Sequence, residues 1–117
     1  MTLIQGQSDY RIEVIIDYQD GSQITQEELA AAESLKIAYR WLLYDDDEEE
    51  DVTYEGEWDA GYGLTSDNEP YLYYNATEDD VVPNNVQRLV GRAIIEDQDG
   101  LISKGTMFEI QVLPDDL

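Results

Sequence analysis

Residues 24–59 read ITQEELAAAESLKIAYRWLLYDDDEEEDVTYEGEWD, and this stretch decides the fold that the chain is expected to adopt. Its centre holds seven consecutive carboxylates, Asp45 to Asp51, in the interior of the sequence rather than at an end. Like charges this close repel one another, so a fold that holds them together loses stability. The run therefore suggests an electrostatic role, and the elements on either side of it would present the charge.

A long helix is predicted before the acidic run, from Gln26 to Tyr44. Thr25 has the position of an N-cap, Glu28 completes a capping box, and Ile24 and Leu29 can form a hydrophobic staple. The helix should end before the carboxylates, because the macrodipole disfavours negative charge at a helix C-terminus. Apolar residues recur at helical spacing and would form its buried stripe: Ala31, Leu35, Ala38 and Leu42, widened by Ile37, Trp41 and Tyr44.

A strand is predicted after the run, from Val52 to Asp59, because apolar and acidic residues alternate there. Its acidic face would carry Glu55, Glu57 and Asp59. Residues on one face of a strand lie about 6.5 to 7 Å apart. We therefore expect a ladder of carboxylates beside the seven-residue run, with Tyr54 and Trp58 facing the core.

Other strands are predicted from alternating patterns. The residue ranges are Tyr10 to Tyr18, Tyr71 to Asn75, Val86 to Glu96 and Phe108 to Val112, the third of which also fits a helix. Gly61 to Gly63 and Ser66 to Pro70 read as a loop, and Thr77 to Pro83 as another. The predicted order is β-α-β-β-β-β, an α+β fold in which one long helix packs on an antiparallel sheet of four to five strands. The 117 residues suffice for a single domain, 1–117.

Composition excludes several functions. The net charge of -22, from 28 acidic and 6 basic residues, repels nucleic acids and anionic membranes and attracts basic proteins. The chain has no cysteine for a disulfide and no histidine for a triad. No signal peptide or apolar run of membrane-spanning length is evident, which favours a cytoplasmic protein.

Catalysis and metal binding are weakly indicated. Paired carboxylates can act as acid and base, but only where one lies in a cleft that raises its pKa, so no enzyme is expected. Calcium and magnesium prefer oxygen ligands. When Gly21 or Gly100 is aligned with the invariant glycine of an EF-hand loop, an isoleucine stands at the first ligand position. Neither a dedicated metal site nor a cofactor is therefore predicted.

The acidic residues are concentrated in one part of the chain. From Trp41 to Gln87 there are 15 Asp or Glu and no Lys or Arg. One interpretation is halophilic adaptation, but this would spread the charge over the whole surface. A second interpretation is a solvated acidic face that has no function. A third interpretation is recognition of a basic surface. The predicted partner-binding residues are Asp45, Asp46, Asp47, Glu48, Glu49, Glu50, Asp51, Glu55, Glu57, Asp59, Asp79 and Asp80.

In its charge, the chain resembles the bacterial and phage DNA-mimic proteins, and in size and charge the small neisserial mimic that binds the histone-like protein HU. The resemblance implies a monomer that occupies the DNA site of a basic DNA-binding protein, such as a nucleoid protein, a repressor or a nuclease. A rival hypothesis is an immunity protein that inhibits a single basic nuclease toxin. Such a protein would use aromatic hot spots, for which the chain offers nine tyrosines and two tryptophans.

Overall fold

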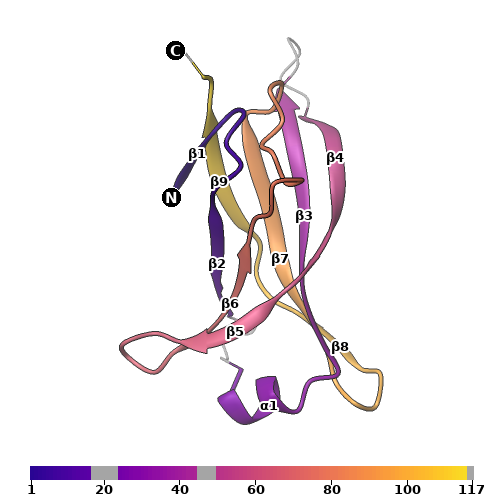
Figure 1. The fold of residues 1–117 in the computed structure, drawn as a ribbon. Coiled ribbons are helices and arrows are strands. Elements are labelled where there is room, and N and C mark those ends of the chain that lie inside the picture. Colours follow the sequence, from indigo (N-terminus) through magenta and orange to yellow (C-terminus); the bar gives the residue numbers. More distant parts are fainter. Residues whose placement is uncertain (17–23, 45–49, 116–117) are drawn as a thin grey trace.

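The residues that the computed structural model describes form two β-sheets and one short helix (Figure 1). The structure describes residues 1–16, 24–44 and 50–115, except for the side chains of residues 44 and 50–53. The elements in chain order are β1 (Thr2–Ile4), β2 (Arg11–Ile15), α1 (Gln26–Ala30), β3 (Ser34–Tyr44), β4 (Glu50–Asp59), β5 (Gly61–Leu64), β6 (Pro70–Asn75), β7 (Arg88–Glu96), β8 (Ile102–Lys104) and β9 (Phe108–Leu113).

The larger sheet has the strand order β1-β9-β7-β3-β4, and β8 pairs with β7 beside this path. The smaller sheet has the order β2-β6-β5. Neighbouring strands run antiparallel except β1 and β9, which are parallel. In Figure 1 β2 and β6 lie in front of the larger sheet, with the α1 helix below both.

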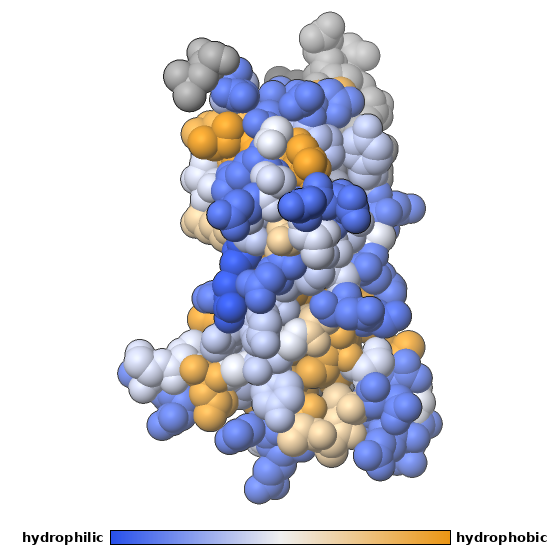
Figure 2. Space-filling model, viewed as in Figure 1, coloured by the Kyte–Doolittle hydropathy of each residue, from blue (hydrophilic) through white to orange (hydrophobic). Residues whose placement is uncertain are grey.

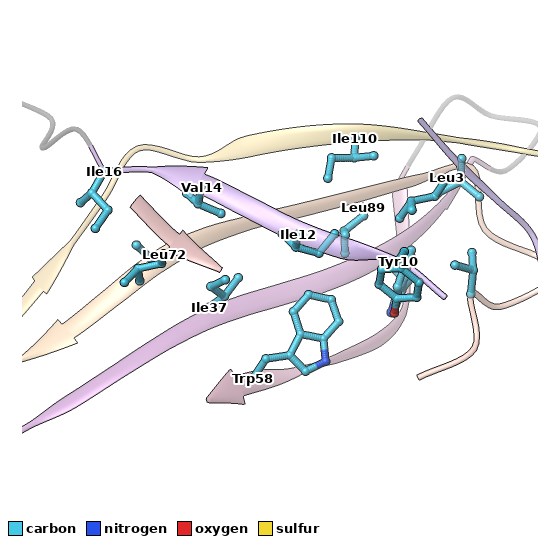
Figure 3. Packing of buried hydrophobic residues seen from close by; sticks show 14 of the residues in the cluster. Leu3, Tyr10, Ile12, Val14, Ile16, Ile37, Trp58, Leu72, Leu89 and Ile110 are labelled. Atoms are coloured by element: carbon cyan, nitrogen blue, oxygen red, sulfur yellow. The ribbon is translucent and has the colours of Figure 1, made fainter. Parts of the chain in front are cut away.

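The core lies between the two sheets. Figure 3 shows Ile12 and Val14 of β2 on one side and Ile37 of β3 and Leu89 of β7 on the other. On β2 every second residue is buried, as expected for a strand with one face on a core. One apolar cluster includes buried residues of both sheets: Leu3, Tyr10, Ile12, Val14, Ile16, Ile24, Leu29, Ile37, Trp41, Trp58, Leu72, Val82, Val86, Leu89, Ala93, Ile95, Ile110 and Val112.

The predicted long helix is wrong, and with it the α+β fold class. Its start is confirmed: Thr25 caps α1 by accepting a hydrogen bond from the Glu28 N–H at 3.1 Å, and Leu29 is buried. The helix ends at Ala30, however, and the chain enters β3 at Ser34. Most of the residues assigned to the rest of the helix form β3, an interior strand of the larger sheet, which pairs with β4 on one edge and with β7 on the other.

The error has a physical cause in the period of the apolar residues. Ile37, Tyr39 and Trp41 alternate with Lys36, Ala38 and Arg40, so the same segment also fits a strand. Isoleucine and aromatic residues pack well on a pleated surface, and pairing on both edges satisfies the backbone polar groups of this segment. The tertiary pairing outweighs the helical spacing of the stripe.

Most of the predicted strands are confirmed, in contrast to the predicted long helix. β2, β4, β6, β7 and β9 lie within or close to predicted ranges, and the ambiguous third range is a strand. The Gly61–Gly63 segment is not a loop but part of β5. Gly61 pairs with Tyr73, and a Cβ on this glycine would come within 2.6 Å of the Tyr73 ring. The glycine is needed because the tyrosine of the neighbouring strand lies across it, which stabilises a glycine in a sheet.

Candidate binding cleft

The predicted partner-binding residues fall into three groups. Asp45 to Glu49 lie outside the described residues, and the side chains of Glu50 and Asp51 do too. Glu55, Glu57 and Asp59 are exposed on β4. They alternate with buried Trp58, so the predicted ladder on the outer face is confirmed. Asp79 and Asp80 lie in the connection between β6 and β7, on the other side of β4.

The ladder is not an uninterrupted row of negative charge, as the sequence suggested. Lys36 Nζ lies 3.4 Å from a carboxylate oxygen of Glu57, and Arg40 Nε lies 3.3 Å from one of Glu55. Exposed ion pairs of this kind add at most about 1 kcal/mol to stability, but each cancels a negative charge locally. The two cations are distant from the acidic window in sequence and reach it because β3 pairs with β4.

The helix-borne surface and the histone-like partner expected from the DNA-mimic resemblance therefore need correction. The surface expected to be delivered by a long helix belongs to a sheet, and α1, the helix that the described residues form, has 5 residues. The carboxylates of Glu55 and Glu57 face cations of their own chain. These findings leave no structural basis for a helix-borne mimic or for the histone-like protein as its partner.

A cleft of about 540 Å³ lies on the other side of β4. Its lining combines aromatic rings with acidic and amide side chains, and we call it the aromatic cleft. The lining residues are Tyr10, Tyr39, Trp41, Tyr54, Trp58, Asp79, Asp80, Val81, Val82, Pro83, Asn84 and Asn85.

Stacked rings form the wall of the aromatic cleft. Trp58 lies between Tyr39 and Tyr74, with ring centroids 3.9 and 4.8 Å away and nearly parallel planes. Trp41 meets Trp58 edge-on at 6.5 Å. Offset-stacked and edge-to-face contacts are the favoured arrangements of aromatic pairs. The wall is therefore a rigid block made from β3, β4 and β6.

A glycine makes the stack possible. Gly56 is the cross-strand partner of Tyr39, two residues before Trp58. A Cβ at Gly56 would lie 2.8 Å from Tyr39 Oη and 3.1 Å from Cζ. Because Gly56 has no side chain, the Tyr39 ring can lie across β4 and reach the face of Trp58.

Asp80 anchors the acidic rim. Its Oδ2 accepts hydrogen bonds from the Tyr74 hydroxyl, from the Thr77 N–H at 2.8 Å and from Thr77 Oγ1 at 2.9 Å. Desolvation alone would raise the pKa of Asp80, but the hydrogen bonds from Tyr74 and Thr77 outweigh it and hold the pKa below its ordinary value. Asp80 is thus a fixed negative charge at neutral pH.

The surrounding tyrosines stay protonated. Desolvation, with the hydrogen bond to Asp80 and its charge, raises the pKa of Tyr74 to about 12. Burial, followed by the charge of Asp80, also raises the pKa of Tyr10 and Tyr39. The Tyr10 hydroxyl donates to the backbone oxygen of Asp80 at 2.7 Å. The neutral phenol of Tyr74 donates to the carboxylate of Asp80 and that of Tyr10 donates to its backbone oxygen, so both hold Asp80 in place without adding negative charge.

Two predictions for aromatic residues have different outcomes. Trp58 faces the core as predicted, with 6% of its surface exposed. Tyr54 was predicted to face the core as well, but it is 54% exposed at the aromatic cleft. Sequence reasoning did not single out Tyr10, Tyr39 and Tyr74 as site residues. The abundance of tyrosine was the available signal, and it does not say which rings meet.

The described residues show neither a cluster of metal ligands nor a membrane-spanning helix. Among them, no three Asp or Glu are grouped so that they could hold a metal ion. None of the helices formed by the described residues has the length and apolar character needed to cross a bilayer. The view of Figure 2 shows a mostly hydrophilic surface with separate apolar areas.

No protein-family model and no curated protein matches this chain. Among solved structures, CopC from Methylosinus trichosporium OB3b is similar, with 16% sequence identity and a TM-score of 0.42, over 99% of this chain and 87% of that chain. A likeness of this degree transfers neither function nor binding residues to the present chain.

Proposed function

We propose that the protein binds a cationic segment of a partner protein, and that a lysine or arginine side chain of the partner enters the aromatic cleft. One observation carries the proposal: exposed Tyr54 lines the same cleft as Asp79 and Asp80, on a chain of net charge -22. The predicted class of partner, a basic protein, is retained from the sequence. The surface that would bind it is different, because the aromatic cleft replaces the ladder on β4.

The chemistry of the aromatic cleft suits a cation. A positive charge over the face of a tyrosine or tryptophan gains about 0.5 to 2 kcal/mol, depending on its desolvation. Both faces of Trp58 are covered by Tyr39 and Tyr74, so the ring open to a ligand is Tyr54. Asp79 is exposed beside it, and the hydrogen bonds to the Asp80 carboxylate end on Oδ2. A cation can therefore lie over Tyr54 and reach Asp79 and the Oδ1 of Asp80.

The net charge would raise the rate of association with a basic partner and make the affinity depend on salt. A strongly acidic protein attracts a basic partner over several ångströms and accelerates the encounter, and added salt screens this attraction. The aromatic contacts are short-ranged and depend less on salt. Binding should thus weaken with salt without disappearing, if the aromatic cleft contributes as proposed.

Titration with two peptides tests the proposal. Hexa-arginine and an uncharged hexa-glutamine are added to the protein, and binding is followed by the fluorescence of Trp41 and Trp58. Hexa-arginine should bind and hexa-glutamine should not. Tyr54→Ala and Asp79→Asn should each weaken binding about five- to thirtyfold, which corresponds to roughly 1 to 2 kcal/mol.

Two matched variants serve as controls. Tyr62→Ala removes an exposed tyrosine from β5, and Asp67→Asn removes an exposed acid from the β5–β6 connection. Both should leave the affinity within about twofold, the scale of a weak surface effect. If Asp67→Asn weakens binding as much as Asp79→Asn, or Tyr54→Ala has no effect, the peptide is held by general charge and the aromatic cleft is not the site.

That the partner is a DNA-binding protein stays a prediction from charge. A partner captured from lysate can be challenged with duplex DNA, and displacement by DNA would support it. The immunity hypothesis is favoured by one specific observation, the exposed Tyr54 above a rigid aromatic wall, which is the form of an interface hot spot. A single captured nuclease, held equally well at high salt, would favour immunity.

A further inference from the structure

Basic residues gather on the outer face of the larger sheet. Lys36 and Arg40 of β3 alternate with buried core residues, and so do Arg88 and Arg92 of β7. Lys104 of β8 pairs with Ile94, on the same face. Five of the six Lys and Arg in the chain therefore lie on one face.

A depression of about 530 Å³ opens on this face, and we call it the basic depression. Its floor is small and apolar, because Ala38, Val90 and Gly91 lie there. Arg40, Arg92 and Lys104 line its sides, and Glu55 and Glu57 lie along the β4 side. The volume is in the range of sites that hold small molecules.

Register places the cations around Ala38. Arg92 is the direct cross-strand partner of Ala38, and Lys36 and Arg40 stand two residues to either side on β3. Directly opposed residues lie about 5 Å apart and diagonal ones about 7 to 8 Å. Long basic side chains can bridge such distances, so several of these cations can reach one anion above Ala38.

Two of the cations form no ion pair with the residues that the structure describes. Arg40 is paired with Glu55 and Lys36 with Glu57. Arg92 and Lys104 make no ion pair with any described residue, on a chain with 28 carboxylates. The paired groups cancel one another, and the positive charge that remains beside the apolar floor is that of Arg92 and Lys104.

We propose that the basic depression binds a small amphipathic anion, a molecule with one phosphate or carboxylate group and an apolar body. The anionic group would lie between Arg92 and Lys104, and the apolar body over Ala38 and Val90. A nucleic acid is disfavoured, because the net charge of -22 repels an extended polyanion. The site is independent of the aromatic cleft, which lies on the opposite face of β3 and β4.

Amide NMR shifts of Gly91 and Ala38 during titration test the inference. Octyl phosphate, inorganic phosphate and octyl glucoside serve as probes, all below the concentrations at which they form micelles. Octyl phosphate should give saturable shifts, inorganic phosphate should bind at least tenfold more weakly, and octyl glucoside should give no saturable shift. Arg92→Gln and Lys104→Gln should each weaken octyl phosphate about tenfold, the loss expected for one charge-assisted hydrogen bond.

The matched control is Arg11→Gln, which removes an exposed arginine from the smaller sheet and should leave the affinity unchanged. Thermal melts establish that each variant is folded, and exposed Lys104 provides a readout if Arg92→Gln melts early. The inference is overturned if octyl phosphate gives no saturable shift or if octyl glucoside binds equally well. It is also overturned if Arg11→Gln lowers the affinity for octyl phosphate as much as Lys104→Gln does.

Discussion

Removal of the Trp58 side chain should be among the most harmful single changes in this protein. Trp58 is 6% exposed and touches aromatic rings on three sides, with Tyr39 and Tyr74 stacked on its two faces and Trp41 against its edge. Trp58→Ala removes the ring from the core. It also removes the contact that links Tyr39 of β3 with Tyr74 of β6. No other described side chain is stacked in this way between the two sheets.

The magnitude follows from two contributions. Truncation of a buried Trp or Phe to alanine costs about 3 to 5 kcal/mol. Each aromatic pair adds roughly 0.5 to 1.5 kcal/mol beyond the buried area, part of which the truncation value already contains. We therefore expect a loss of about 4 to 5 kcal/mol, which is a large fraction of the roughly 5 to 15 kcal/mol of a typical domain.

Urea denaturation, followed by far-UV circular dichroism, measures this loss. The midpoint should fall while the slope stays constant, if the transition remains two-state. Tyr54→Ala is the matched control, because this aromatic residue of the same strand is 54% exposed and should lose less than about 1 kcal/mol. A loss below about 1 kcal/mol for Trp58→Ala would refute the stacking argument and make Trp58 a binding residue rather than a core residue.

Three further predictions concern local features. Stability should fall below about pH 4, because the depressed pKa of Asp80 favours its charged form in the folded state, and it should fall again as pH rises from about 10 to about 12, through the raised pKa of Tyr74. In Tyr74→Phe, the melting temperature should fall less steeply at both the acid and the alkaline end of the pH range. If it falls as steeply as in the wild type at both ends, the pH dependence does not come from Asp80 and Tyr74. Gly56→Ala should displace the Tyr39 ring and cost about 1 to 3 kcal/mol by overpacking, measured by urea denaturation, whereas the same change at Gly100 meets no atoms within 4 Å and tests only its positive φ. Thr25→Ala should lose about 1 kcal/mol of cap stability, detectable as a lower melting temperature, and equal loss in Thr25→Ser would argue against the cap.

Local signals were sufficient for the start of the helix and for most strands. The cap of Thr25 and the alternation of Ile12, Val14 and Ile16 depend on neighbours in sequence, and the structure has both features. The end of the helix could not be read locally, because the segment from Ser34 to Tyr44 fits a period of 3.6 and a period of two. Its conformation is decided by pairing with β7, whose residues lie about fifty positions away in the chain.

The candidate site was less predictable than the strands. Its walls come from Tyr10, Tyr39, Tyr54 and Trp58, and its rim from Asp79 and Asp80, on segments that no sequence spacing connects. The neutralisation of Glu55 and Glu57 was unpredictable for the same reason, because it depends on residues that are distant in sequence. A sequence window free of Lys and Arg does not exclude cations that a neighbouring strand brings to it, here Lys36 and Arg40.

The place of β4 at the border of its sheet has a consequence for the behaviour of the protein at high concentration. β4 is 10 residues long and pairs, among the described strands, with β3 alone. A long edge strand with unpaired backbone groups can template the addition of further chains and start aggregation. A second β4 docking on this edge would bring its own Asp59 close to the same acidic face, where Glu55 and Glu57 are paired with Arg40 and Lys36 but Asp59 has no ion pair with a described residue. Like charges in opposed positions of a sheet are destabilising. We therefore expect Asp59 to disfavour the addition of further chains at this edge, and acid to weaken that protection by protonating its carboxylate.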